Sequence, residues 1–279
     1  MSRKSSNIDF LTVKGFGEEW AAYDQSCLPA DEARAHFDAY FACFRWDLVN
    51  EHSVGFDMGC GSGRWAKLLA PRIGHLHCID PSAALDIARR NLAGLKNVSF
   101  HSASVDAVPL VPETMDFGVS LGVLHHVPNT AAAIRDCAKL LKPGAPLLLY
   151  LYYRFDNRPI WYRGIWRISE MGRQTISRLP RSIRISLTAI IAAIIYWPLG
   201  RLAALIAAMG IDPHPLPLAQ YRNASFYTMR TDALDRFGTR LEQRFTQREI
   251  ADMLHAAGFI EVRFSPAAPY WCVCAVRST

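Results

Sequence analysis

The sequence predicts an α/β protein built on a doubly wound, mostly parallel sheet, with a helical insertion towards its C-terminal end. Three observations support this prediction. Short apolar segments alternate with helical patterns between residues 54 and 152, which is the order typical of parallel sheets. The connections between them are short, and right-handed crossovers then place helices on both faces of the sheet. Residues 153–230 are too long for a loop and carry a helical periodicity of their own.

The first strand, residues 54–57, leads into three alternate glycines, Gly59, Gly61 and Gly63, and then into a helix. The strand ends in an acidic residue, Asp57. Glycines let a ligand approach the backbone where any Cβ atom would collide with it. The helix that begins near Gly63 directs free N–H groups and its positive dipole end at the same ligand. This stretch therefore predicts a site for a nucleotide-like cofactor.

The second strand, residues 75–80, also ends in an acid, Asp80, and a helix over residues 82–92 follows, with Ser82 placed to cap it. A carboxylate at this strand tip offers two acceptor oxygens, so it can accept hydrogen bonds from both hydroxyls of a ribose. We expect the remaining strands and helices at residues 97–101, 115–120, 130–141, 147–152, 246–258, 260–264 and 270–276. The last two are strands, expected to form an antiparallel hairpin, which brings the sheet to seven strands.

An apolar stripe precedes the glycine turn, within residues 16–50. Phe37, Phe41, Phe44 and Leu48 recur at spacings of four, three and four residues, which is typical of one face of a helix. We expect this stripe to pack on the core of the sheet domain.

Composition restricts the class of protein. The chain has 279 residues, of which 51% are hydrophobic and 20% charged, as expected of a globular protein. Residues 1–7 are polar and lead into no apolar segment, so no signal peptide is predicted and a cytoplasmic location is expected. The seven cysteines form no C-x-x-C pair, so neither a disulfide framework nor a metal site is expected.

The positive charge is concentrated in the insertion. Between residues 151 and 210 only Asp156 and Glu170 are acidic, whereas the arginines are Arg154, Arg158, Arg163, Arg167, Arg173, Arg178, Arg181, Arg184 and Arg201. Residues 185–200 carry no charge, and Pro198 is predicted to interrupt the helix there. A membrane span needs roughly 20 apolar residues, so this interrupted run is predicted not to cross a membrane.

Two interpretations of the insertion remain open. Its helices can form a cap that packs on the sheet domain or on a second copy in a homo-oligomer. Alternatively, apolar helices flanked by arginines suit peripheral contact of residues 153–210 with a membrane, or with an amphiphilic substrate that has an anionic head. Nucleic acid is disfavoured as a partner, because the arginines share helices with long apolar stripes and form no continuous basic face.

The run from Asp57 to Gly63 resembles the acidic-residue and G-x-G-x-G signature of class I S-adenosylmethionine-dependent methyltransferases. Residues 61–66 also fit the dinucleotide pattern G-x-G-x-x-G/A, so an NAD(P)-dependent oxidoreductase is the alternative. Asp106 resembles the methyltransferase residue that accepts the adenine amino group, and residues 121–128 resemble the motif after strand four. The resemblance implies a seven-stranded Rossmann-like methyltransferase sheet with a helical cap insertion, and S-adenosylmethionine as cofactor.

The resemblance also implies which residues form the site. The expected cofactor residues are Asp57, Gly59, Gly61, Gly63, Asp80, Val105, Asp106 and Leu121, with Trp20 and Tyr23 closing over the cofactor. His125 and His126 stand where the methyl group would emerge, and either is a candidate general base. Their alternative role is to hold the loop through backbone hydrogen bonds. The candidate substrate contacts are Arg158, Tyr221, Arg222 and Tyr227, which can also be internal contacts of the cap.

We expect an N-terminal helical lid over residues 1–50, a cofactor-binding core over 51–152 and 240–279, and a cap over 153–239. The expected activity is methyl transfer to a small or amphiphilic acceptor, with oxygen in a sugar, lipid-linked or secondary-metabolite intermediate as the favoured target. Residues 151–159 and 221–227 are similar to a bacterial methyltransferase group associated with such pathways. The Asn/Asp-Pro-Pro-aromatic run of base N-methyltransferases is absent. A non-catalytic scaffold that docks membranes or partners is a further alternative.

Overall fold

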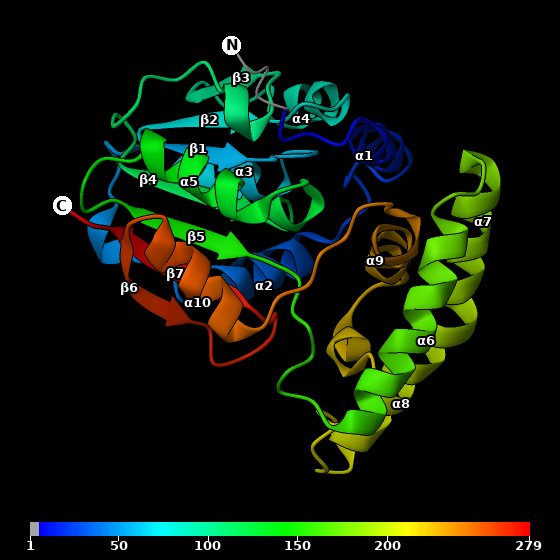
Figure 1. The fold of residues 1–279 in the computed structure, drawn as a ribbon. Helices are drawn as coiled ribbons and strands as arrows, with labels where there is room; N and C mark the ends of the chain where they lie inside the picture. The colour runs from blue at the N-terminus through cyan, green and yellow to red at the C-terminus, as the bar shows by residue number, and fades with distance from the viewer. Residues whose placement is uncertain (1–5) are drawn as a thin grey trace. The chain divides into compact units, whose positions relative to one another are not determined.

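The computed structural model describes residues 6–279 and divides them into two compact units (Figure 1). The first unit contains the N-terminal segment up to Ala21, residues 34–156 and residues 241–279. The second contains residues 22–33 and 157–240. Each unit is described by itself below.

The first unit is built on a seven-stranded sheet with the order β3-β2-β1-β4-β5-β7-β6. The strands are β1 Val54–Met58, β2 His75–Ile79, β3 Val98–His101, β4 Phe117–Leu121, β5 Pro146–Tyr150, β6 Phe259–Phe264 and β7 Cys272–Arg277. β1 to β5 pair in parallel, whereas β7 is antiparallel to both β5 and β6. The predicted seven-stranded, doubly wound sheet with its C-terminal hairpin is confirmed.

Helices cover both faces of this sheet, as Figure 1 shows. α5 (Thr130–Leu140) and α10 (Gln247–Ala256) pack on one face, where Ile134 and Leu254 are fully buried. The other face is covered by α2 (Ala30–Tyr40), α3 (Arg64–Leu69) and α4 (Ala84–Asn91). α10 begins at the predicted cap residue, Thr246, which forms a capping box with Glu249.

The N-terminal stripe is confirmed for three of its four residues. Phe37, Phe41 and Phe44 are buried against the sheet, next to α1 (Phe10–Ala22) and α2 in the sequence. Leu48 is 39% exposed, so its predicted burial is wrong. α2 ends at Tyr40 and Leu48 lies in the 3₁₀ turn η1 (Trp46–Leu48), where the helical spacing no longer decides which side a residue faces.

The second unit is helical, with α6 (Ile160–Ile176), α7 (Arg181–Ile191), α8 (Trp197–Ala208), the 3₁₀ turn η6 (Ala219–Asn223) and α9 (Phe226–Gly238). α7 continues into α8 through a π segment, η5 (Ala192–Tyr196), so one helix runs from Arg181 to Ala208. The predicted interruption at Pro198 is therefore wrong. The wide turn bonds Trp197 N to the Ala192 carbonyl, five residues back, and this local adjustment lets a proline sit in the helix.

The helix from Arg181 to Ala208 is long and apolar enough to cross a membrane, which differs from the expectation that its apolar run is too short. Only 22% of its most apolar 18-residue window is buried. Length and composition alone do not separate a spanning helix from other apolar helices, so its exposed side is considered further below.

A small apolar core and an ion-pair network hold the second unit together. Ala192 and Tyr196 of the long helix pack against Met229 and Ala233 of α9. Glu170 of α6 accepts hydrogen bonds from Arg173 and from Arg236 of α9. The helices therefore pack through their inner sides on α9.

Candidate functional site

The glycine turn after β1 leaves no room for side chains. Gly59 has a φ of +77°, and a Cβ atom there would lie 2.3 Å from Cγ1 of Val123. A Cβ atom at Gly61 would lie 3.0 Å from the indole Nε1 of Trp20. The structure therefore brings Trp20 and the turn together, and the turn presents bare backbone at the carboxyl end of β1, where ligands bind in open parallel sheets.

Asp57 is the most unusual group at this turn. Its side chain is 1% exposed, and neither carboxylate oxygen has a hydrogen-bond partner among the residues that the structure describes. Burial, together with the negative charge of Asp80, raises the pKa of Asp57 to about 7, although Arg64 opposes the shift. A buried carboxyl without a partner is costly, so this site is suited to a ligand that carries positive charge.

The buried carboxyl of Asp57 is expected to make the ligand-free protein less stable as the pH rises from about 4 to about 7. Its pKa rises from 3.8 to about 7, so the folded state binds the proton more tightly than the unfolded state does. The stability from protonated Asp57 is complete below the lower value and is lost as the pH passes the higher one. Urea unfolding over this range should show a slope of up to about 1.4 kcal/mol per pH unit. Asp57→Asn should remove that slope, and parallel pH profiles for the two proteins would contradict the assignment.

Asp80 holds the turn from the tip of β2. Its Oδ2 accepts the N–H of Gly61 at 2.9 Å, and its Oδ1 accepts the N–H and hydroxyl of Ser82 at 2.8 and 2.6 Å. Burial raises the pKa of Asp80, while these hydrogen bonds act in the opposite direction. Each carboxylate oxygen has two lone pairs, so acceptor capacity remains for a ligand. Ser82 serves Asp80 as well as the N–H of Ala84 near the start of α4.

Asp106 lies in the 3₁₀ turn η3 (Val105–Ala107), and the N-terminal segment contacts it. Its Oδ2 accepts the N–H of Asn7 at 2.9 Å and its Oδ1 accepts the hydroxyl of Ser104 at 2.6 Å. Partial burial raises the pKa of Asp106, but these hydrogen bonds outweigh it and the pKa lies below its ordinary value. Asn7 also exchanges two hydrogen bonds with the backbone of Asn129. No sequence signal pointed to Asn7.

The apolar members of the predicted site, Val105 and Leu121, are 7% and 5% exposed. Val105 belongs to the core on the α5 side of the sheet, and Leu121 to the core on the α3 side. Both are therefore fixed by packing at strand or turn ends of the first unit.

His125 and His126 lie in the 3₁₀ turn η4 (Leu124–His126) after β4, and their environments differ. His125 is fully buried and stacks on Tyr152, with ring centroids 3.9 Å apart, and neither of its ring nitrogens has a partner among the described residues. Burial, with the nearby charges of His126 and Arg244, lowers the pKa of His125 far below its ordinary value. His125 is therefore neutral near neutral pH.

His126 is oriented by a hydrogen bond. Its Nδ1 lies 2.7 Å from the carbonyl oxygen of Leu241, and a carbonyl only accepts, so Nδ1 carries the hydrogen and the lone pair resides on Nε2. Phe16 packs edge-on against the ring, with centroids 4.9 Å apart. The ring is thus held in one tautomer and one orientation.

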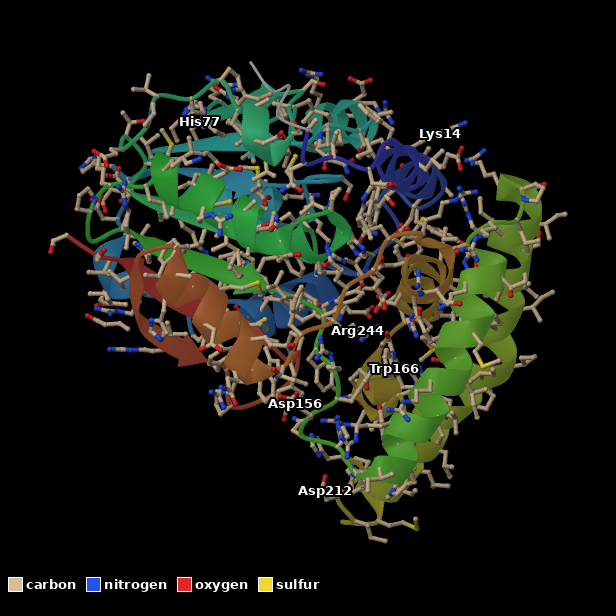
Figure 2. The ribbon with its side chains drawn as sticks, in the orientation of Figure 1. Lys14, His77, Asp156, Trp166, Asp212 and Arg244 are labelled. Carbon is tan, nitrogen blue, oxygen red and sulfur yellow. The ribbon has the colours of Figure 1, made fainter. Side chains whose placement is uncertain are left out.

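Sequence reasoning missed a buried ion pair beside these histidines. Arg244, labelled in Figure 2, donates from Nε to Glu242 Oε1 at 2.7 Å, and the two side chains are 10% and 2% exposed. Its guanidinium lies 4.9 Å from the ring of Tyr152. Burial lowers the pKa of Arg244, but Glu242 and Tyr152 outweigh it and the pKa stays raised. This places a permanent positive charge next to the Tyr152–His125 stack.

The remaining predicted residues belong to the second unit and contact one another. Tyr23 is 4% exposed and packs against Tyr227, and the hydroxyl of Tyr227 accepts the N–H of Gln25 at 2.9 Å. Tyr221 donates to Asp232 at 2.8 Å. Arg158 donates to the carbonyl oxygen of His214 at 2.6 Å. Arg222 is exposed, and its Nη1 lies 3.5 Å from the Ala219 carbonyl. These contacts are internal to the cap, and binding roles for these residues stay predictions.

Comparison with known proteins agrees with this geometry. Residues 56–149 match the model of a methyltransferase domain family. The chain is 37% identical over 151 residues to a protein of Stutzerimonas stutzeri (strain A1501) named ubiquinone biosynthesis O-methyltransferase, covering 50% of this chain and 61% of that protein. A protein of the same name from Hahella chejuensis is 29% identical over 154 residues, covering 50% and 60%.

Among solved structures, the fold is similar to that of the S-adenosylmethionine-dependent methyltransferase SibL, with a TM-score of 0.53 at 15% identity, over 88% of this chain and 56% of that one. The chain spans less than two thirds of the length of the curated relatives it matches, 61% in the Stutzerimonas stutzeri protein. The matched family segment ends at residue 149, before the helical insertion begins.

Proposed function

Because the chain belongs to the class I S-adenosylmethionine-dependent methyltransferases, we propose that it transfers a methyl group from S-adenosylmethionine to an oxygen of a small or amphiphilic acceptor. The observation that carries the proposal is the bare glycine turn beside the partnerless, buried carboxyl of Asp57. The family also favours this cofactor over the nicotinamide alternative.

The residues at the turn fit this cofactor by shape and by charge. S-adenosylmethionine carries positive charge on its sulfonium and ammonium groups, which complements the buried carboxyl of Asp57. We assign Asp80 to the ribose hydroxyls, Asp106 with Val105 to the adenine, and Leu121 to the methionine portion. The backbone of Gly59, Gly61 and Gly63 would pass directly beside the cofactor, with Trp20 against the turn. Tyr23 as a second closing residue belongs to the same proposal.

When bound, the cofactor supplies an electrophilic methyl group on a sulfonium. The chain's task is to hold the acceptor oxygen in line with that methyl group and to exclude water, which supplies roughly 7–11 kcal/mol in well-oriented reactions. No covalent residue is needed. An alcohol or phenol acceptor must lose its proton, and a general base shortens the barrier to that step.

We assign the general base to His126 in preference to His125. The hydrogen bond from its Nδ1 to Leu241 leaves the lone pair on Nε2, the atom that would take the proton. His125 is a weaker base because burial lowers its pKa. Its stack on Tyr152 and its place beside His126 suit a positioning role.

His126→Ala is expected to lower kcat by about 10²–10⁴-fold, the usual contribution of a general base, while leaving the affinity for S-adenosylmethionine within about twofold. A radiometric methyl-transfer assay and calorimetry measure the two quantities separately. His126→Phe, which preserves the ring volume beside Phe16, serves as a packing control and should be equally slow. Turnover close to wild type in either variant removes His126 from the mechanism.

For the acceptor, we propose an amphiphilic molecule with a hydroxyl group. Relatives named for ubiquinone biosynthesis support this class, and the arginine-rich cap, with Arg158, Tyr221, Arg222 and Tyr227 as candidate contacts, suits an acceptor with an anionic head. Sugar and secondary-metabolite hydroxyls remain within the same proposal. We also place the protein at the inner face of a membrane, where such an acceptor would reside.

Calorimetry and mass spectrometry test this function. S-adenosylmethionine and S-adenosylhomocysteine should bind, whereas NAD(H) should not, and incubation with a lipid extract should add one methyl group to a hydroxyl-bearing component. Binding of NAD(H) alone would overturn the proposal. Cofactor binding without transfer to any fraction of a cell extract would favour a non-catalytic scaffold.

A further inference from the structure

The long helix of the second unit has an outer side of large apolar side chains that nothing in its own unit covers. We call these residues the outer stripe: Ile183, Ile190, Ile194, Trp197, Leu205 and Met209, with exposed fractions of 52%, 53%, 65%, 48%, 59% and 60%. Their spacing of three to eight residues keeps them on one side of a helix that is about 42 Å long at 1.5 Å per residue. Soluble monomers rarely expose an apolar strip of this extent.

α6 repeats the pattern. Its exposed residues include Ile160, Trp161, Ile165, Ile168 and Met171, with exposed fractions of 79%, 51%, 49%, 71% and 71%. Its opposite side, which carries Ser169, Glu170 and Arg173, faces α9 and the chain that follows it. Trp166, labelled in Figure 2, lies on that side too. Both helices therefore bury their polar or small residues and expose their large apolar ones.

Arginines border these apolar residues. Between residues 160 and 211 the only acidic residue is Glu170, which is occupied by Arg173 and Arg236. Arg163, Arg167 and Arg181 are exposed, and among residues 6–279 no acidic side chain forms an ion pair with them. The surface is thus apolar with a positive border, and a partner that matches it must be apolar with a negative border.

The inner side of the long helix argues against a transmembrane orientation. Its buried residues are Thr188, Ala192, Tyr196, Gly200 and Ala203, which pack on η6 and α9. α9 carries charged side chains, including Asp232 and Arg236. Crossing the bilayer would either strip away these contacts or draw charged groups into the hydrocarbon, which costs several kcal/mol per charge. A helix with one packed side and one apolar side instead lies in the plane of the interface.

A second copy of the chain is a poorer match than a membrane. A twofold interface places the same patch on both sides, so the arginines that border one stripe would meet the arginines that border the other. Like charges opposed in this way weaken an interface. A bilayer that contains anionic phospholipid has no such conflict, because phosphates accept bidentate hydrogen bonds from arginine while the acyl region receives the isoleucines and tryptophans.

We propose that the outer stripe docks flat on an anionic bilayer, with Arg163, Arg167 and Arg181 at the phosphate level. This rests on the proposed membrane location and identifies the surface that produces it. The docked helix holds the catalytic unit at the depth where an amphiphilic acceptor presents its head. Two signals act together, since apolar insertion and electrostatic attraction are each weak alone.

Vesicle sedimentation of the full chain tests the proposal. The wild-type protein should bind phosphatidylcholine vesicles that contain phosphatidylglycerol, bind pure phosphatidylcholine weakly, and leave both at high salt or in alkaline carbonate. Ile190→Glu/Ile194→Glu should weaken binding at least about tenfold. Arg163→Gln/Arg167→Gln/Arg181→Gln, which changes only exposed side chains, should weaken it about a hundredfold. The matched controls in the first unit, Ile260→Glu (47% exposed) and Arg248→Gln, should bind as wild type.

Each other outcome is informative. Absence of wild-type binding, or wild-type binding by both groups of variants, overturns the proposal. Resistance to carbonate extraction indicates a spanning helix, and a change from dimer to monomer in light scattering of the Ile190→Glu/Ile194→Glu variant indicates a second copy; either result replaces the bilayer surface. Calorimetry with S-adenosylmethionine runs alongside. Vesicle binding by a protein that binds no cofactor would refute the proposed activity and leave the docking surface standing.

Discussion

Glu242→Gln is expected to lower the free energy of unfolding by about 3–5 kcal/mol, the usual cost of breaking a buried ion pair. The change leaves the guanidinium of Arg244, 10% exposed, without the carboxylate that lies 2.7 Å from its Nε. Arginine cannot lose its proton to escape this cost. Urea denaturation monitored by circular dichroism measures the difference.

Two controls separate this effect from a general loss of negative charge. Asp252→Asn removes a carboxylate that is 70% exposed and lies 3.9 Å from Arg248, and it should change stability by less than about 0.5 kcal/mol. The double variant Glu242→Leu/Arg244→Met should recover most of the lost stability, because apolar pairs of similar volume often replace buried ion pairs without loss. A loss below about 1 kcal/mol in Glu242→Gln would mean that water solvates the pair.

Gly59→Val is expected to weaken S-adenosylmethionine binding by at least about a hundredfold, since strain and overpacking at one residue each cost about 1–3 kcal/mol. The new Cβ atom would lie 2.3 Å from Cγ1 of Val123, in a backbone conformation with φ of +77° that β-branched residues avoid. The turn must therefore move, and the cofactor surface moves with it. Calorimetry gives the affinity directly.

Gly94→Ala is the matched glycine control, because nothing lies within 4 Å of the position of its Cβ atom. It should bind the cofactor as wild type does. Thermal unfolding of both variants shows whether the loss at Gly59 is local. Near-normal affinity in Gly59→Val would mean that the bare turn is not the cofactor surface.

The sheet was predictable because its information is local. Strands such as residues 54–58 and 75–79 are short apolar runs separated by helical periodicity, and each of them formed where the pattern indicates. Leu48 shows the limit of that method. Its spacing from Phe44 fits a helix, but the helix ends at Tyr40, and nothing in the spacing marks that end.

Half of the candidate site was invisible in the sequence because it is assembled from distant segments. The turn at Asp57 and the histidines at 125 and 126 follow strands and could be identified from position alone. Arg244 and Asn7 lie 118 residues after His126 and 99 residues before Asp106, respectively, and no local motif marks either. Their roles depend on burial and contacts, which only the fold defines.

In the insertion, periodicity identified helical faces but not which face turns inward. Trp161, Ile165 and Ile168 do share one face of α6, as their spacing predicts, yet they are 51%, 49% and 71% exposed. Hydrophobic spacing normally marks the buried side. Here the buried side carries the ion pairs of Glu170 and Arg173 with the chain around α9.

The π segment at residues 192–196 has a consequence for how this helix keeps two sides along its whole length. Buried positions on it recur every four residues, at Thr188, Ala192, Tyr196 and Gly200. In a regular α-helix such a series rotates by about 40° at each step, so Gly200 would have turned well away from α9. A wider turn in the middle cancels part of that rotation. The missing N–H of Pro198 and the four-residue spacing of small residues are thus two parts of one arrangement, which resets the phase of the helix halfway along.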